Sequence, residues 1–562
     1  MSLHPKVQQR AGNNSTELWP PGTVLLEDNS GPEKKFILQP RPSEDPNDPL
    51  NWAKWRKAIN FGFVCFYSVL VSEFISSSGP TWTPMHKQLG FGYDMLNNAY
   101  AAGSAALGVG SLLLIPFALK LGRRPIYLFS TVMQFGLSIW SARMWSVADL
   151  MSINLLQCLF GSLAEVIVQM TVADVFFVHQ RGRLNSTYIW LWKTAGALGS
   201  LIAGFITTGL GWRWVWWLNA IFFGLFSILI ALFYEETKYC PPAIVEQVAG
   251  NDLQPSGDSN VIDQSRQDKG LGTDAINSTK SLGSQEQGVS EDLYATKIDH
   301  NIPMKTWRQR LALTTISTTD EGFKDILRHL YQPLVLLTTV PAVLWTASVY
   351  GVLVALQDVI STCQSTFLTR PPYNFTASGV GFMSIAKFIG LTIGSLLGGV
   401  VSDRVIIYAA RRNNGVFEPE ARLWSFIPFI LFVPAGGLMF GIGLNNGAPW
   451  PVIAVGLALY NVGVAPILAI TVTYLTDSYE DVVGDALVGV TFLRNAISAA
   501  FVFAVDPWVE ATSIKWCLVA IVLISMFFMS LSVVFIIWGK QFRGRTAARY
   551  QYYARRQFRS RG

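Results

Sequence analysis

Long apolar runs, separated by short polar stretches, dominate the chain. Most of these runs are nearly free of charge and about 20 residues long, the length that an α-helix needs to cross a ~30 Å hydrocarbon core. We find twelve, and their approximate ranges are 58–78, 95–119, 125–142, 149–171, 185–208, 213–234, 333–356, 377–400, 423–444, 450–475, 485–506 and 515–538. The pattern predicts an all-α membrane protein with twelve transmembrane helices, six in each half.

Polar segments divide the chain into five parts. These are an N-terminal tail (1–57), a six-helix bundle (58–234), a linker (235–331), a second six-helix bundle (332–538) and a basic tail (539–562). The first tail is rich in Pro and Asn and the linker in Ser, Asp, Gln and Gly, so neither can bury a core and we expect both to be disordered.

The end of the linker differs from the rest. Four apolar residues recur there at helical spacing, and they are Phe323, Ile326, Leu327 and Leu330. This spacing indicates either an amphipathic helix lying along the membrane surface or an ordinary helical lead-in to the seventh span. Both interpretations stay open at this point.

Composition supports a membrane protein without a cofactor. Hydrophobic residues make up 51% of the chain and charged residues only 14%, against about 25% charged in soluble domains. The 19 Trp and 18 Tyr suit the two membrane interfaces. The five Cys are scattered, with no CxxC and no His partners, so we expect no metal and no redox site.

Lysine and arginine gather on one side of the predicted spans. That side holds Lys54, Arg56, Lys57, Lys120, Arg123, Arg124, Arg181, Arg183, Arg404, Arg411, Arg412, Arg422 and eight more after residue 538. The other side holds only Lys87, Arg143, Arg213, Arg370 and Lys515. The positive-inside rule therefore predicts that both termini and the linker are cytoplasmic.

This orientation makes two further predictions. The sequon Asn374-Phe-Thr376 falls outside, where a glycan is expected, and Asn185-Ser-Thr187 falls inside and is not expected to carry one. The basic C-terminal tail is interpreted as an anchor on anionic lipid rather than as a nucleic-acid site.

The two halves repeat one another. Gly110-Ser-Leu-Leu in the second span matches Gly394-Ser-Leu-Leu in the eighth, and Lys120 then falls on Arg404. Spans four and ten end near Asp174 and Asp477, and the span after each carries a cation, Lys193 or Arg494. Parallel duplication is a recurrent transporter design, so we expect two related bundles around a central cavity.

The loops after spans two and eight resemble the signature of the major facilitator superfamily, Gly-x-x-x-Asp-Arg/Lys-x-Gly-Arg-Arg/Lys. The first copy keeps the basic half, in Lys120, Arg123 and Arg124, but has Ile115 and Leu119 in place of the Gly and Asp. The second copy keeps Gly399-Val-Val-Ser-Asp403-Arg404. The resemblance covers roughly residues 50–540 and implies a carrier whose bundles rock about a shared site.

The same resemblance implies a conformational gate. The family's loop acid caps a helix end and pairs with Arg across the bundle interface in the outward-facing state, which implies a latch at Asp403 and a weakened one at Leu119. We also expect Asp174 and Asp477 to pair with loop arginines such as Arg181. The predicted gate residues are Lys120, Arg123, Arg124, Asp174, Arg181, Asp403, Arg404 and Asp477.

Three further stretches are similar to the fungal branch of twelve-span drug:proton antiporters, and within it to the yeast histidinol and polyamine type. They are EDPNDPLNWAKWRK (44–57), GWRWVWW (211–217) and FYEETKY (233–239). The antiporter signature of span five, Gly-Pro-x-x-Gly-Gly, appears as Gly199-Ser-Leu-Ile-Ala-Gly204 without its Pro. The direction of transport is therefore open.

Ionisable residues inside spans are candidates for function, because each costs about 2.5–3.5 kcal/mol at bilayer depth. Family resemblance places spans one and four at the cavity, which makes Glu73 and Glu165 candidate proton acceptors or sites for a cationic substrate. A static pair between Glu165 and Lys193 is the alternative. The predicted substrate or proton-coupling residues are Glu73, Glu165, Lys193, Lys387, Arg494 and Asn461.

The sequence thus predicts a monomeric, proton-coupled secondary transporter of a small organic molecule in the plasma membrane. Export of drugs, toxins or secondary metabolites is the first interpretation, and uptake of a cationic amine or a non-transporting nutrient sensor are the alternatives. An enzyme is not expected, since HExxH, GxSxG and GxxxxGK[ST] do not occur.

Overall fold

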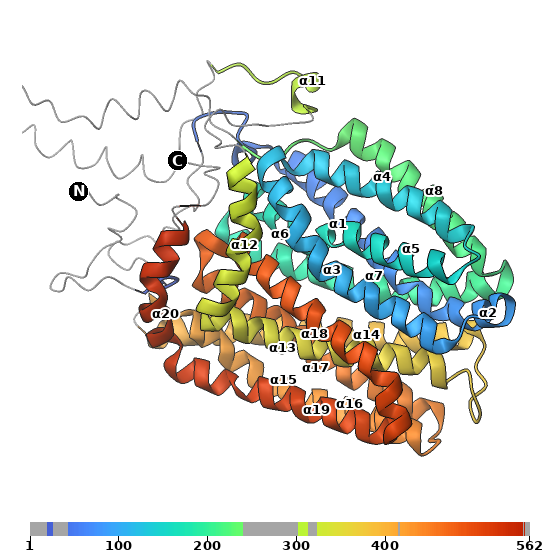
Figure 1. Cartoon of the computed structure of the whole chain (residues 1–562). Coiled ribbons are helices and arrows are strands. Elements are labelled where there is room, and N and C mark those ends of the chain that lie inside the picture. The colour runs from blue at the N-terminus through green and yellow to red at the C-terminus, as the bar shows by residue number, and fades with distance from the viewer. Residues whose placement is uncertain are drawn as a thin grey trace, which may run out of the picture.

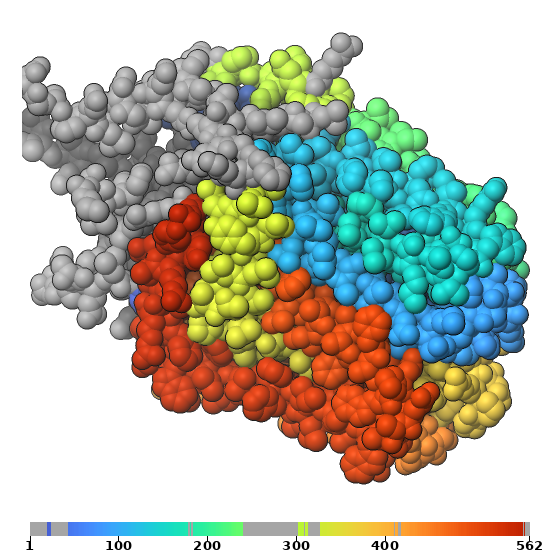
Figure 2. Space-filling view, viewed as in Figure 1, coloured from blue at the N-terminus to red at the C-terminus, as the bar shows by residue number. Residues whose placement is uncertain are grey.

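The computed structural model describes residues 20–25, 43–239, 302–312, 323–413, 416–554 and 556, and almost all of them are helical (Figure 1). Two bundles of long helices lie side by side, and Figure 2 shows them meeting along a seam between blue-green and yellow-red halves. The all-α, two-bundle fold predicted from the apolar runs is confirmed.

The first bundle contains six crossings built from eight helices, because two crossings are interrupted. The elements are α1 (Lys54–Ser76) with α2 (Ser78–Leu89), α3 (Tyr93–Leu121), α4 (Arg123–Ala142), α5 (Val147–Gly161) with α6 (Leu163–Val175), α7 (Val178–Gly209) and α8 (Trp212–Phe233). The breaks fall at Ser77 and Ser162, each of which caps one helix and begins the next.

The second bundle repeats this arrangement. Its elements are α12 (Phe323–Thr339) with α13 (Pro341–Phe367), α14 (Ala377–Arg412), η3 (Pro419–Phe426) with α15 (Ile427–Ile430) and α16 (Phe432–Asn445), α17 (Trp450–Ser478), η4 (Glu480–Val482) with α18 (Val483–Ala511), and α19 (Ile514–Ser530) with α20 (Ser532–Ala554). Outside both bundles lie η2 (Pro49–Asn51), α11 (Trp307–Arg310) and the short strands β1 (Val24–Leu25) and β2 (Val416–Phe417).

The duplicated glycines allow the same close contact between helices in both halves. Gly110 on α3 lies against the carbonyl of Leu159 on α5, and Gly394 on α14 lies against the carbonyl of Val462 on α17. A side chain at either glycine would meet that backbone, so both positions require close helix contact. The GSLL repeat therefore marks equivalent packing of spans two on four and eight on ten.

Eleven helices of the described residues are long and apolar enough to cross a membrane. The twelfth crossing, α4, falls short because its inward face is polar, with Ser130, Thr131, Gln134 and Ser138 all buried. Its outward face remains apolar, with Phe129 and Val132 exposed. The low mean hydropathy of α4 thus reflects packing in the bundle and not a different location.

We call the end of the molecule that carries residues 20–25, 43–53, 234–239, 302–312 and α20 the tail side, and the opposite end the hairpin side (Figure 1). The helix predicted over 323–330 is the first part of α12, which packs on α3 and α18 and continues into α13 after a break at Val340. His329 and Gln332 of α12 are buried. The segment is therefore a lead-in to the seventh crossing and not a helix on the membrane surface.

Part of the predicted disordered tail contacts the body of the molecule. Asp48 caps η2 by accepting from the Leu50 N–H (2.9 Å), and Trp52 stacks under Arg56 (3.9 Å from the ring centre). Arg56 forms an ion pair with Glu235, and Tyr239 donates to Asp45 (3.2 Å). The EDPNDPLNW and FYEETKY stretches therefore bind one another across the tail side. The bulk of the predicted linker, 240–301 and 313–322, lies outside the described residues.

A second N-terminal segment contacts the opposite half. β1 pairs antiparallel with β2, with Val24 opposite Phe417. The fully buried Arg543 of α20 donates to both carboxylate oxygens of Glu420 (2.8 and 2.6 Å), to Thr23 Oγ1 (3.1 Å) and to the Pro21 carbonyl. Residues 539–554 of the predicted basic tail continue α20 as a helix. Arg543 thus ties the N-terminal segment, the η3 loop and the last helix together.

Replacing Arg543 with Gln should destabilise this junction, because removing one partner of a buried ion pair costs about 3–5 kcal/mol. We expect a lower melting temperature in detergent and faster proteolysis within residues 20–25. Lys540→Gln is the matched control, because Lys540 lies on the same helix as Arg543 and also forms an ion pair, with Glu418 (2.6 Å). The Lys540 side chain is 58% exposed, and an exposed ion pair contributes only about 0–1 kcal/mol. Equal melting temperatures for the two variants would contradict the role given to Arg543.

The two sequons differ in accessibility. Asn374 lies exposed on the hairpin side with φ 49°, whereas Asn185 lies within α7 on the opposite half of the membrane span. We expect Asn374→Gln to remove a glycosidase-sensitive gel shift in a eukaryotic host and Asn185→Gln to leave it intact. A shift that depended on Asn185 would reverse the predicted orientation.

Candidate functional site

A cavity of about 200 Å³ lies between the two bundles. Residues of both halves line it, from α1, α2, α3 and α5–α7 on one side and from α13, α14, α17 and α18 on the other. Five charged side chains face it, two acids and three bases, and they are Glu165, Asp358, Lys193, Lys387 and Arg494. Within the described residues, no group of His, Cys, Asp and Glu is arranged to hold a metal ion.

An ion pair in the cavity joins one bundle to the other. Glu165 of α6 forms an ion pair with Arg494 of α18, and both side chains are less than a tenth exposed. Asn495 donates to the same carboxylate (3.2 Å), and the guanidinium lies 4.9 Å from the ring centre of Tyr350. The sequence analysis gave both residues as candidate substrate or proton-coupling residues and offered a static Glu165–Lys193 pair as the alternative. The structure instead pairs Glu165 with a residue of the opposite half.

Asp358 of α13 is a cavity acid that the sequence analysis missed. It accepts a short hydrogen bond from Ser498 of α18 (2.5 Å) and another from the Tyr100 hydroxyl of α3 (3.1 Å). Lys193 and Lys387 lie within electrostatic range of it. The available signal was the lone acid in the apolar stretch 341–367, but the seventh span was predicted to end at residue 356.

Three other predicted residues line the cavity. Lys193 comes from α7 and Lys387 from α14, and Lys387 donates to Ser361 (3.0 Å). Asn461 of α17 is buried, and its side-chain amide donates to the Leu457 carbonyl (2.8 Å). Trp190 and Trp192 of α7 add aromatic surface. Sequence reasoning therefore identified four of the five charged lining residues.

Glu73 lies apart from this group. It is not among the residues that line the cavity, although its neighbour Ser72 is. Its carboxylate accepts from Ser77 (2.5 Å), and its side chain and backbone pack on Gly199 of α7 beside Asn219 of α8. The predicted proton role of Glu73 would thus have to act through the contact between α1, α7 and α8.

Close contacts join the two bundles on the hairpin side of the cavity. The Asn97 amide of α3 donates to the Val502 carbonyl (3.0 Å) and to Asp506 (2.9 Å), both on α18. Gly204 of α7 lies against Ala377, and Gly381 of α14 lies against Ser200, so those backbones nearly touch. These contacts hold the two bundles together on the hairpin side.

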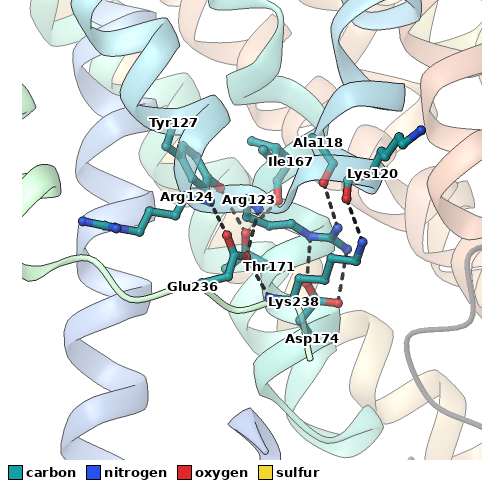
Figure 3. Close-up of polar contacts among 10 residues, drawn as sticks. All are labelled: Ala118, Lys120, Arg123, Arg124, Tyr127, Ile167, Thr171, Asp174, Glu236 and Lys238. Atoms are coloured by element: carbon teal, nitrogen blue, oxygen red, sulfur yellow. Dashed lines mark hydrogen bonds and ion pairs between the residues drawn. The ribbon is translucent and has the colours of Figure 1, made fainter. Parts of the chain in front are cut away.

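Each half carries an equivalent ion pair on the tail side. Arg123 at the start of α4 holds Asp174 at the end of α6 (2.9 Å, Figure 3), and Arg422 in η3 holds Asp477 at the end of α17 (2.7 Å). The paired residues lie 51 positions apart in the first half and 55 in the second. Each acid thus binds an arginine of the preceding crossing within its own half. The side chain of Arg181 lies outside the described residues, so its contact with Asp174 stays a prediction.

The first pair belongs to a larger network (Figure 3). Glu236 accepts from the backbone N–H groups of Arg123 (2.9 Å) and Arg124 (3.0 Å) and so caps the start of α4. Gly122, with φ 111°, leaves no side chain that would clash with this carboxylate. Lys238 donates to the carbonyl of Lys120 (2.9 Å), which satisfies the end of α3. The FYEETKY stretch thus closes the loop that carries the family signature.

The remaining predicted gate residues take different positions. Arg124 is buried and donates to the carbonyls of Ala231 (2.8 Å) and Leu311, which ties α8 and the end of the linker to α4. Asp403 and Arg404 are exposed, and neither forms an ion pair with another described residue. The latch that the family resemblance implies at Asp403 is therefore not formed in this conformation. In the second half it is Asp477 that binds a loop arginine, Arg422.

Asp174→Asn and Asp477→Asn should each lower the melting temperature of the detergent-solubilised protein. The first removes the carboxylate that binds the buried Arg123, and the second removes the one that binds the partly buried Arg422. We expect a loss of several degrees in each case, and no change for Asp403→Asn, which is exposed. A larger loss for Asp403→Asn than for Asp477→Asn would restore the latch at Asp403.

Comparison with known proteins agrees with this geometry. The sequence model of the family described as Major Facilitator Superfamily matches residues 61–503 of the chain. The chain is 30% identical to an uncharacterized MFS-type transporter of Schizosaccharomyces pombe, over 92% of this chain and 89% of that protein. It is also 30% identical to Protein HOL1 of Saccharomyces cerevisiae, over 90% of each. Efflux pump radE of Floropilus chiversii is 23% identical over 94% and 90%.

Among solved structures, the human organic anion transporter MFSD10 aligns with a TM-score of 0.53 at 14% identity, covering 86% of this chain and all of that one. The xylose transporter XylE of E. coli aligns with a TM-score of 0.51 at 13% identity, covering 84% and 98%. At sequence identities this low, the structural similarity shows that the fold is shared and nothing about the substrate. With the duplicated bundles, the central charged cavity and the family match over most of its length, the chain belongs to the major facilitator superfamily of membrane transporters.

Proposed function

We propose that the protein is a proton-coupled secondary transporter that exports a small organic molecule by alternating access. The observation that carries this proposal is the ion pair between Glu165 and Arg494, which joins the two bundles inside the cavity. A carboxylate that can be neutralised by a proton, placed on the contact between the moving parts, links proton binding to the movement.

The mechanism follows from the charges. With Glu165 ionised, its attraction to Arg494 and the bond from Asn495 hold α6 against α18. A proton on Glu165 removes the negative charge, while the guanidinium stays charged because its affinity for protons is high. The contact between the bundles then weakens, and the equilibrium shifts toward the conformation in which the two helices separate.

The tail-side ion pairs have a separate role in this proposal. Arg123–Asp174 and Arg422–Asp477 each join neighbouring crossings of one bundle, so they hold each half together as it moves. Movement is then concentrated at the seam between halves, where the α3–α18 and α7–α14 contacts lie. Rigid halves rocking about a shared site is the general scheme for duplicated carriers.

Export is supported by similarity to a protein named as an efflux pump and by the antiporter-like stretches of the sequence. Uptake of a cationic amine is the alternative direction. The sign of proton movement separates the two, because an exporter exchanges protons for substrate and an importer moves both the same way. Plasma-membrane location and a single-chain carrier complete the proposal.

Proteoliposomes that contain the full chain and a luminal pH dye test this proposal. Labelled spermidine, rhodamine 6G and 4-phenylbutyrate serve as probes, with an acidic lumen at the start. We expect at least one probe to accumulate while protons leave the lumen, and a protonophore to abolish the accumulation. Accumulation of the probe only when the lumen starts alkaline, with protons entering together with it, would instead indicate uptake. No gradient-dependent flux with either gradient would reject the proposal.

Glu165→Gln should strongly reduce gradient-driven accumulation and retain exchange of labelled for unlabelled probe, because Gln fills the same space without binding a proton. The loss of coupling should reach about 5- to 150-fold, the range typical of linked equilibria. Accumulation and counterflow are measured in the same vesicles.

Glu73→Gln is the matched comparison, since it removes a half-buried carboxylate that does not line the cavity. We expect this variant to keep gradient-driven accumulation. Loss of coupling in Glu73→Gln, with coupling intact in Glu165→Gln, would transfer the proton role to Glu73.

A further inference from the structure

We infer that the cavity recognises a carboxylate, or a similar anionic group, on a small molecule with an apolar or aromatic body. This inference rests on the proposed transport function and names the substrate class of that same site. It follows from which hydrogen-bonding groups in the cavity are already occupied and which remain free for a ligand.

Both cavity acids are already bonded to protein donors. Glu165 holds Arg494 and accepts from Asn495 (3.2 Å). Asp358 accepts from Ser498 (2.5 Å) and Tyr100 (3.1 Å), one on each carboxylate oxygen. A cationic ligand would therefore have to displace protein donors before it could bind either acid.

The two cavity lysines have the opposite property. An ammonium group carries three donors. Lys387 uses one of them, on the neutral hydroxyl of Ser361 (3.0 Å). Lys193 forms no hydrogen bond and no ion pair with any other described residue, although it faces the cavity. Free donors of positive charge are what an anionic acceptor requires.

The balance of charge points the same way. Three bases and two acids line the cavity, and one base is consumed by its pair with Glu165. Asp358 is the single remaining acid opposite Lys193 and Lys387. One added negative charge would balance the second of these two lysines. An added cation would instead be repelled by an excess of positive charge in a medium of low dielectric constant.

The rest of the lining describes the body of the ligand. Trp190 and Trp192 lie beside Lys193 on α7, and Ile189, Val354 and Leu391 add aliphatic surface from both halves. Ligand sites commonly combine such apolar walls with a few polar groups that fix orientation. A compact aromatic or branched carbon skeleton fits a cavity of about 200 Å³.

The placement of the lysines also connects binding to transport. Lys193 belongs to the first bundle and Lys387 to the second, and their helices α7 and α14 pack on one another. A carboxylate bound between them would bridge the bundles. Such a bridge favours the conformation in which the two lysines are close, which is the differential binding that a carrier needs.

Three probes with one carbon skeleton test the inference: 4-phenylbutyrate, 4-phenylbutanamide and 4-phenylbutylamine. Their binding to the full chain in nanodiscs is measured by titration calorimetry, with empty nanodiscs subtracted. We expect the carboxylate to bind at least about tenfold more tightly than the amide, and the amine to bind least, because each charged hydrogen bond lost costs roughly that factor or more.

Two lysine variants locate the site. Lys193→Gln and Lys387→Met should each weaken carboxylate binding about tenfold or more and change amide binding little, so that retained amide binding proves each variant folded. Lys515→Gln, whose lysine lies near Trp516 outside the cavity, is the control and should bind the carboxylate normally.

The outcomes distinguish this inference from the proposed function. Tighter binding of the amine than of the carboxylate, or carboxylate binding that is unchanged in both cavity-lysine variants, would overturn the inference. Gradient-driven flux of spermidine in the vesicle experiment would then leave the transporter proposal standing. Carboxylate binding that depends on both lysines, without flux of any probe, would support the inference and reject proton-coupled transport.

Discussion

The need to partner every charge buried between the bundles determines how this molecule is built. An ionised group at bilayer depth persists only beside an opposite charge or several hydrogen-bond donors. Glu165 meets this need with Arg494, from the other bundle, and not with Lys193 from its own. Because the partners belong to separate halves, the pair joins the two bundles in this conformation. In the mechanism that we propose, the same pair couples proton binding to the separation of the halves.

Much of the fold could be predicted from the sequence because the membrane imposes strict rules. Twelve apolar runs gave twelve crossings, and the GSLL repeat identified the glycines that bring α3 onto α5 and α14 onto α17. Isolated charges within runs identified Glu165, Lys193, Lys387 and Arg494 as cavity residues. These signals are local: a charge or a close glycine contact inside hydrocarbon has few possible explanations.

What the sequence could not provide depends on contacts between distant segments. Asp358 was missed because the apolar run at 333–356 includes the end of α12, so the seventh crossing was placed several residues too early. The pairing of Glu165 with Arg494 was not predicted, because pairing across bundles leaves no regular spacing in the sequence. The N-terminal segments looked disordered because their polar residues bind Glu235, Tyr239 and Arg543, which lie 179 or more positions away in the chain.

The tail-side ion pairs show how duplicated halves can keep a contact while the motif around it changes. Family resemblance directed attention to the loop acid, which the first copy lacks at Leu119 and the second retains at Asp403. Yet both copies hold a different pair in common, Arg123–Asp174 and Arg422–Asp477. In the first copy, Glu236 supplies the carboxylate that caps α4. The missing loop acid is thus replaced by an acid from the segment that follows α8, the last helix of the first bundle. Because a carboxylate near a helix start stabilises it wherever it comes from in the chain, the charge is retained even where the motif is not.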